Sequence, residues 1–166
     1  MKAVVVTVSD RVSRGEAEDR SGPAAASRLA SLGLEVEVRV VPDGEEPVAG
    51  ALRAAVAAGA ALVVTTGGTG LGPRDQTPEA TARVIERPAP GLAEAMRAAT
   101  FGRNPHGMLS RAVCGVAGGC LIVNLPGSVS GVEESLDVIA PALPHALTLL
   151  AGEEGSHRPP GEARDE

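Results

Sequence analysis

The chain has 166 residues, of which 43% are hydrophobic, and a formal net charge of −6. This length predicts one domain with a substantial core, and because no apolar run reaches about 18 residues we expect no membrane-spanning helix. The negative charge and the single aromatic residue, Phe101, argue against a nucleic-acid partner, which would need basic side chains for phosphates and rings for stacked bases. The apolar start is too short for a signal peptide, so we expect a cytoplasmic protein.

Strands and helices alternate along the chain. In chain order, the pattern predicts a strand over 2–8, a helix over 22–33, a strand over 34–40, a helix over 46–59, a strand over 61–66, helices over 78–86 and 91–100, a strand over 120–124 and a helix over 131–150. The polarity of 34–40 alternates, which is typical of a strand near a sheet edge. Pro141 and Pro144 should interrupt the last helix.

This alternation predicts an α/β fold with a mainly parallel sheet, formed by a single domain over residues 1–151. The tail, 152–166, loses periodicity and gains charge and proline, so we expect it to be disordered. Cys114 and Cys120 have no second pair and no histidine at zinc-ligand spacing, which favours reduced thiols in the core.

Unusual local sequences follow four of the predicted strands directly. They are Ser9-Asp10-Arg11, Pro42-Asp43, the segment TTGGTG over 65–70, and NLPGS over 124–128. Ligands bind outside the carboxyl ends of the strands in an open parallel sheet, so these segments should converge on one crevice. A fifth segment, Met108 to Arg111, suits either an anionic ligand or a surface turn.

Taken singly, these motifs have ordinary explanations. The glycines of 67–70 could form a plain turn, Asp43 could cap the next helix, and Asp75 could brace the helix that begins at Thr77-Pro78. The glycine turn is neither a Walker loop, since no lysine follows it, nor a dinucleotide fingerprint, since its third glycine is misplaced.

Together, the glycine turn and the two aspartates point to a metal. Amides of a glycine turn favour an anion, whereas carboxylates oppose it by about 4 kcal/mol for unit charges roughly 4 Å apart at an effective dielectric near 20. A cation between them resolves the conflict, and Mg²⁺ is commonly held by one or two carboxylates plus substrate phosphates. The sequence therefore predicts Asp43 and Asp75 as metal ligands in a transfer reaction on phosphate groups.

The segments TVSDR, DRSGP, VVPD, TTGGTG, PRDQTPEAT, PGLAEAMR, MLSRAVCG and LIVNLPGS, in this order, resemble the MogA/MoaB family of molybdenum-cofactor biosynthesis proteins, which includes the G domain of gephyrin. The resemblance covers residues 3–150. It implies a three-layer αβα domain, usually a homotrimer, that binds molybdopterin and ATP. Adenylyltransferases of the family transfer AMP from Mg·ATP to the terminal phosphate of molybdopterin, release pyrophosphate and prepare the product for a downstream molybdenum insertase.

The resemblance also implies roles for particular residues. The two aspartates needed for that activity match the catalytic and metal-binding candidates Asp43 and Asp75. The residues that match substrate- or nucleotide-binding positions, or that belong to the glycine turn, are Ser9, Asp10, Gly67, Gly68, Thr69, Gly70, Thr100, Ser110, Asn124, Pro126, Gly127 and Ser128.

An alternative function within the same pathway is a non-catalytic module that binds molybdopterin or other pathway proteins. Some MoaB-type relatives lack the arginine-aspartate-x-threonine-proline arrangement, whereas here Arg74-Asp75-Gln76-Thr77-Pro78 is intact. Carboxylates beside a phosphate cost affinity unless a metal uses them, which favours the enzyme.

Overall fold

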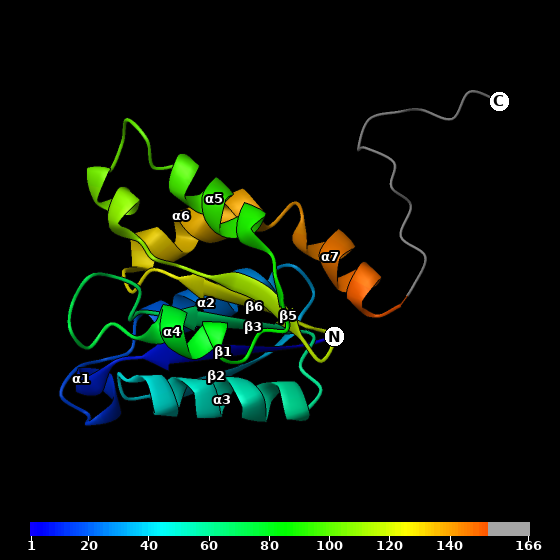
Figure 1. Cartoon of the computed structure of the whole chain (residues 1–166), viewed down its shortest axis with the longest axis horizontal. Helices are drawn as coiled ribbons and strands as arrows, with labels where there is room; N and C mark the ends of the chain where they lie inside the picture. The colour runs from blue at the N-terminus through cyan, green and yellow to red at the C-terminus, as the bar shows by residue number, and fades with distance from the viewer. Residues whose placement is uncertain (153–166) are drawn as a thin grey trace.

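The computed structural model describes residues 1–152 (Figure 1), so nearly all of the predicted tail lies outside the described residues. The strands are β1 (Lys2–Val8), β2 (Glu35–Val41), β3 (Leu62–Thr66), β4 (Arg87–Pro88), β5 (Cys114–Ala117) and β6 (Cys120–Leu125). The helices are α1 (Asp10–Ser13), α2 (Ser21–Ala30), α3 (Glu45–Ala57), α4 (Thr77–Ala82), α5 (Pro90–Ala98), α6 (Val129–Ile139) and α7 (Leu143–Leu150), with a 3₁₀ helix η1 (Pro105–Leu109).

One sheet in the order β2-β1-β3-β6-β5-β4 organises the domain. Strands β2, β1, β3 and β6 are parallel, whereas β5 and β4 are antiparallel to their neighbours. The predicted α/β class, the mainly parallel sheet and the edge position of β2 are therefore confirmed. The sequence pattern missed β5 and β4, because both are short and β5 joins β6 through the two-residue turn Gly118-Gly119.

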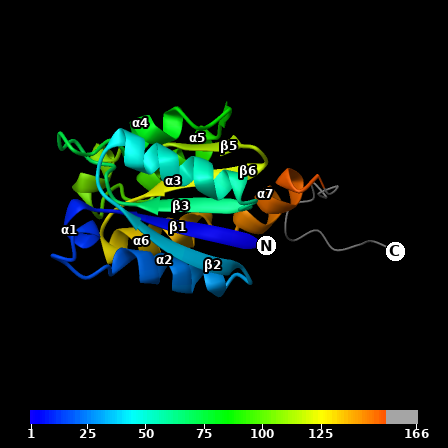
Figure 2. The ribbon, with the colours of Figure 1, turned by 90° about the horizontal axis from the view of Figure 1, so that it is seen from below.

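Helices cover both faces of the sheet in three layers. Figure 1 shows α3 below the sheet and α5 and α6 above it, and Figure 2 shows α3 crossing the lower face, with β2 along one edge. Alternate residues of β1 serve the two cores: Val5 packs with α2, α5, α6 and α7, whereas Val4 and Val6 pack with α3 and α4. Burial on both faces explains why β1 is apolar throughout.

The prolines expected to interrupt the last helix do so. Helix α6 ends at Ile139, and α7 begins at Leu143 with Pro144 in its first turn, where a missing N–H costs nothing. No helix within residues 1–152 is long and apolar enough to cross a membrane.

Both cysteines are free and buried, as the sequence predicts. Cys114 packs into the core on one face of the sheet and Cys120 into the core on the other, so the two thiols point in opposite directions. Burial raises the pKa of each thiol from 9.0 to about 11.

We expect neither thiol to react with iodoacetamide in the folded protein at pH 8. A pKa of about 11 in place of 9.0 lowers the thiolate fraction about 100-fold, and burial further blocks access. Mass spectrometry after timed alkylation checks this, with the urea-unfolded chain as the reactive control. Rapid alkylation of the native protein would contradict the placement of both side chains.

Candidate functional site

The carboxyl ends of the four parallel strands meet at one edge of the sheet. The N–H of Ser9, after β1, donates to Val41 O of β2 at 3.0 Å, and the N–H of Gly67, after β3, donates to Leu125 O of β6 at 3.2 Å. The four predicted segments therefore converge, as expected for an open parallel sheet.

The glycine turn after β3 is too tightly packed for side chains. Gly67 has φ +97°, and a Cβ there would lie 2.5 Å from the carbonyl oxygen of Val8. Thr77 clamps the turn to the start of α4: its Oγ1 donates to Gly67 O at 3.0 Å, and its N–H donates to Gly68 O at 3.1 Å. This turn is thus a fixed element between β1 and α4 rather than a loose connection.

Besides the groups bonded to Thr77, the turn has two backbone N–H groups that remain available to a ligand. No group within residues 1–152 accepts a hydrogen bond from the N–H of Thr69 or Gly70. The Thr69 hydroxyl is also without a partner in this part of the chain, although the residue is only 7% exposed. Within residues 1–152, every side-chain N or O that is fully buried has a hydrogen-bond partner, so this unpartnered hydroxyl must be accessible to solvent. It opens onto a cavity. The geometry suits an anion.

Asp10 and Asp43 bind each other's backbone. The N–H of Asp10 donates to Asp43 Oδ2 at 2.7 Å, and the N–H of Asp43 donates to Asp10 Oδ1 at 3.1 Å. Asp43 does not cap the next helix, because the N-cap of α3 is Gly44 and no side chain caps it. The reciprocal bonds instead hold two carboxylates side by side where β1 and β2 end.

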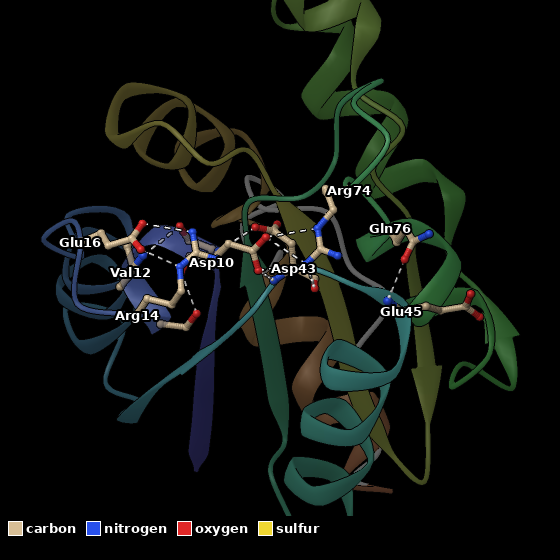
Figure 3. A network of polar contacts seen from close by, with 10 residues as sticks. Asp10, Val12, Arg14, Glu16, Asp43, Glu45, Arg74 and Gln76 are labelled. Atoms are coloured by element: carbon tan, nitrogen blue, oxygen red, sulfur yellow. Dashed lines mark hydrogen bonds and ion pairs between the residues drawn. The ribbon is translucent and has the colours of Figure 1, made fainter.

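Arg74 is the cation beside this acidic pair (Figure 3). Its guanidinium forms a bidentate ion pair with Asp10, with Nη2 at 2.9 Å from Oδ2 and 3.0 Å from Oδ1, and Nη2 donates to Asp43 O at 2.9 Å. The sequence led us to expect Asp43 and Asp75 around a cation. The structure brings Asp10 against Asp43, and Arg74, the residue before Asp75, supplies a positive charge there.

Asp75 folds back onto its own loop. Its Oδ2 accepts the N–H of Gly72 at 2.9 Å, and a Cβ at Gly70 or Gly72 would lie within 3.0 Å of that oxygen. It does not cap α4, whose N-cap is Gln76 without a side-chain bond. Glycine at both positions is therefore the condition for the carboxylate to pack over the loop, and Oδ1 has no partner within residues 1–152.

Arg111 braces this loop and resolves the ambiguity of the segment Met108 to Arg111. Its Nε donates to Gly70 O at 2.8 Å, its Nη2 donates to Asp75 O at 2.6 Å, and its Nη1 pairs with Glu79. The hydrogen bond from Arg111 also lowers the pKa of Glu79. With all three nitrogens engaged by the protein, Arg111 serves as a structural tie rather than a free anion ligand.

Two cavities open at this end of the sheet, and both are bordered by Gly127. Cavity 1, about 230 Å³, lies under α5, η1 and the start of α6. Cavity 2, about 490 Å³, lies between the ends of β1 and β2 and the start of α2. The shared wall is thin, because a Cβ on Gly127 would come within 3.2 Å of Gly67 Cα.

The predicted site residues divide between the two cavities. Cavity 1 is lined by Thr69, Gly70, Thr100, Ser110, Pro126, Gly127 and Ser128. Cavity 2 is lined by Ser9, Asp43 and Gly127. Gly67, Gly68, Asp10 and Asp75 line neither, although Gly67 packs against Gly127, which borders both. The serines at 9 and 128 also cap α1 and α6, where each hydroxyl oxygen accepts a backbone N–H and keeps its own proton to donate.

Asn124 occupies a different place from the one that the sequence indicates. Its side chain is fully buried: Oδ1 accepts the N–H of Val113 at 3.1 Å, and Nδ2 donates to the hydroxyls of Thr65 and Thr81 at 3.1 and 2.8 Å. It lines neither cavity. The residue therefore links β6 to β3, α4 and the segment before β5. These hydrogen bonds stabilise the strand ends that carry the site.

Sequence reasoning missed several polar residues of cavity 1. Glu134 and Ser135 line it from α6, and Arg103 and His106 line it from the segment around η1. The spacing of Ser128, Gly131 and Glu134 on one helix face is the signal that finds the first of these. The residues around η1 carry no periodic signal, and only the fold brings them over the cavity.

Within residues 1–152, no three His, Cys, Asp or Glu side chains gather into a metal-ligating group. Any metal at this end of the sheet would thus take ligands from water or a substrate in addition to carboxylates. That is the usual arrangement for Mg²⁺ in phosphate chemistry.

Comparisons with known proteins agree with this geometry. Residues 4–145 match the family model described as probable molybdopterin binding domain. A molybdopterin adenylyltransferase of Helicobacter pylori is 38% identical over 89% of this chain and 86% of its own length. The solved structure of the molybdopterin biosynthesis Mog protein from Mycobacterium ulcerans superposes with a TM-score of 0.86 at 46% identity, over 92% of this chain and 97% of that one.

Other relatives are longer. A molybdenum cofactor biosynthesis bifunctional protein of Synechococcus elongatus is 42% identical over 90% of this chain, but the match covers 47% of that protein. The chain spans between 23% and 49% of the length of the first four curated relatives it matches.

We expect Gly67→Ala to destabilise the protein by about 2 kcal/mol or more, because it forces a positive φ on alanine and drives Cβ against Val8 O. Gly50→Ala is the matched control. It lies in α3 with nothing within 4 Å of an added Cβ, and should stabilise by about 0.5–1 kcal/mol. Urea unfolding measures both. Equal effects would refute the tight packing of the turn.

Proposed function

The chain belongs to the family of molybdopterin-binding domains, and from this premise we propose that it is a Mg²⁺-dependent molybdopterin adenylyltransferase. It would transfer AMP from ATP to the terminal phosphate of molybdopterin and release pyrophosphate. The observation that carries this proposal is the pair of cavities on either side of Gly127, with the acidic pair Asp10 and Asp43 at one of them. A transfer between two substrates needs two sites with a common border.

Cavity 1 suits the pterin substrate. It is walled mainly by small residues and hydroxyls, with the unpartnered Thr69 and Ser135 hydroxyls each less than a tenth exposed. A flat heterocycle with many donors and acceptors is bound by such converging polar groups in an otherwise apolar pocket. The N–H groups of Thr69 and Gly70 border the cavity where the terminal phosphate of molybdopterin must approach the wall.

Cavity 2 suits the nucleotide. Asp43 and Ser9 line it, and Arg20 at the start of α2 adds a positive charge for the phosphates. Glu18 and Asp19 also line it, so a bound cation would be needed to offset their charge beside a nucleotide. This assignment gives each substrate its own compartment and places the phosphates of both near Gly127. The reaction then joins a phosphate oxygen of molybdopterin to the α-phosphorus of ATP while the bond from that phosphorus to the bridging oxygen breaks and pyrophosphate leaves.

The residues present fit a magnesium ion. Asp43 and Asp75 each use one carboxylate oxygen in a backbone hydrogen bond, and each keeps Oδ1 without a partner within residues 1–152. One or two fixed carboxylate oxygens, completed by phosphates and water, form the donor set that Mg²⁺ prefers. When bound, the ion would neutralise charge on the phosphates. The chain itself fixes the carboxylates through the Asp10 and Gly72 amides.

A non-catalytic molybdopterin-binding module is the alternative function. It needs cavity 1 but gives no reason for acids at the border of cavity 2, where they would repel a second anion. A titration separates the two functions: the module binds molybdopterin without binding Mg·ATP.

We expect Asp75→Asn and Asp43→Asn to lower the rate of adenylyl transfer at least 100-fold, which corresponds to about 2.7 kcal/mol of transition-state free energy. The amide oxygen of asparagine can still accept the hydrogen bonds from Gly72 and Asp10, so each variant should fold. The assay follows adenylylated molybdopterin and pyrophosphate formed from molybdopterin, ATP and Mg²⁺.

Asp137→Asn is the control for the loss of one negative charge. Asp137 lies on α6, pairs with Arg28 on α2 and lines neither cavity. This variant should keep wild-type activity. A wild-type chain without turnover would refute the enzyme, and fully active aspartate variants would refute the roles of Asp43 and Asp75.

We further propose that the protein is a homotrimer in the cytoplasm and passes its product to a downstream molybdenum insertase. Support comes from the family resemblance and from apolar side chains left exposed on the monomer, including Phe101 at 65% and Leu109 at 51%. Light scattering should give three times the mass of one 16.6 kDa chain. A monomeric mass would refute the trimer but would leave the proposed activity unaffected.

A further inference from the structure

Arg74 places its charge where the acidic residues of the site converge (Figure 3). Its Nε and Nη2 both contact the Asp10 carboxylate, at 3.2 Å or less, and Nη2 also donates to the Asp43 backbone. The residue belongs to the loop that carries Asp75, whereas Asp10 and Asp43 follow β1 and β2. One guanidinium therefore joins three segments that all bear a carboxylate.

The contacts make this guanidinium the counter-ion of Asp10 and hold it, through the Asp43 backbone, beside the second carboxylate. Asp10 and Asp43 are held together by reciprocal backbone bonds, so their charges cannot separate to relieve repulsion. Arginine remains protonated at any physiological pH, so the positive charge can leave only if the side chain moves.

The side chain lies at the surface, where water and ions can reach its ion pair. Its exposed fraction is 64%, compared with 24% for Asp10. Ion pairs of exposed side chains are weak and readily exchanged. A small divalent cation carries twice the charge and binds carboxylate oxygens directly, so it competes for the same acids.

We propose that Arg74 is the resident counter-cation of this site: it pairs with Asp10 beside Asp43 until a divalent cation displaces it, and so sets the affinity of the protein for that metal. This inference rests on the proposed function, which makes a divalent cation a partner of Asp43. Arg74 acts on the metal through Asp10 and Asp43 and is a positioning residue.

A purely structural role gives the opposite expectation. If Arg74 only held the loop 70–76 against the sheet, its removal would loosen Asp75 and Asp43 and weaken metal binding. As a competitor, its removal frees the carboxylates and strengthens metal binding. The sign of the change therefore separates the two roles.

The test is a titration of the nucleotide-free protein with Mn²⁺, a spectroscopic probe for Mg²⁺ sites, in which electron paramagnetic resonance counts the free ion. We expect Arg74→Ala to bind Mn²⁺ about 5-fold more tightly than wild type, equivalent to about 1 kcal/mol. Arg74→Lys, which keeps the charge, should stay within about 2-fold of wild type. Asp43→Asn should abolish this binding, which assigns the signal to the site.

Arg83→Ala controls for the loss of one positive charge. Arg83 is 42% exposed and, like Arg74, bonds to more than one acidic residue: it pairs with Glu45 and Glu46, and none of the three lines either cavity. In this variant Mn²⁺ affinity should remain near that of wild type. An Arg74→Ala affinity equal to or below that of Arg83→Ala would overturn the inference, as would a gain that survives in the Asp10→Asn background.

The two proposals fail separately. The Mn²⁺ titration uses no substrate and measures no turnover, so an unchanged affinity in Arg74→Ala alongside normal adenylyl transfer would remove the counter-cation and leave the enzyme. Thermal unfolding of each variant confirms that the folded protein is the species titrated.

Discussion

The close approach of Gly67 to Gly127 is the constraint on which the site depends. Where β3 and β6 end, their backbones turn away within van der Waals contact of each other and of Val8 at the end of β1. Such an approach is possible only without side chains. It leaves the backbone of Gly127 as a border shared by the two cavities.

The acidic side chains of the site are held in fixed positions. The acids lie at the ends of β1 and β2 and in the loop before α4, and each carboxylate accepts a hydrogen bond from a backbone N–H. Fixed backbone donors cost no reorganisation when a ligand arrives. Arg74 balances the acids, while Arg111 ties the loop from the opposite side, so two arginines near one another serve different purposes.

Much of this architecture could be predicted from the sequence, because the apolar runs and the glycine and proline punctuation are strong local signals. The parallel strands, the edge strand and the convergence of four motifs follow from such signals and are confirmed. The sequence could not predict which distant segments contact one another. Nothing local indicates that Asp10 meets Asp43, that Arg74 reaches both, or that Asn124 turns inward to Thr65 and Thr81. The short β5 and the residues around η1 were also missed, because neither segment has a periodic pattern of apolar residues.

The antiparallel direction of β5 affects how a domain of this fold can vary in length. Because β5 runs antiparallel to β6, the chain leaves the sheet after β4, builds α5 and η1 over cavity 1, and re-enters at β5, beside β4. This excursion forms a roof over cavity 1 that packs on α6 and on the outer part of the sheet. Insertions or deletions between α5 and β5 would reshape cavity 1 while the strand ends below it, built from the central sheet, keep their dimensions.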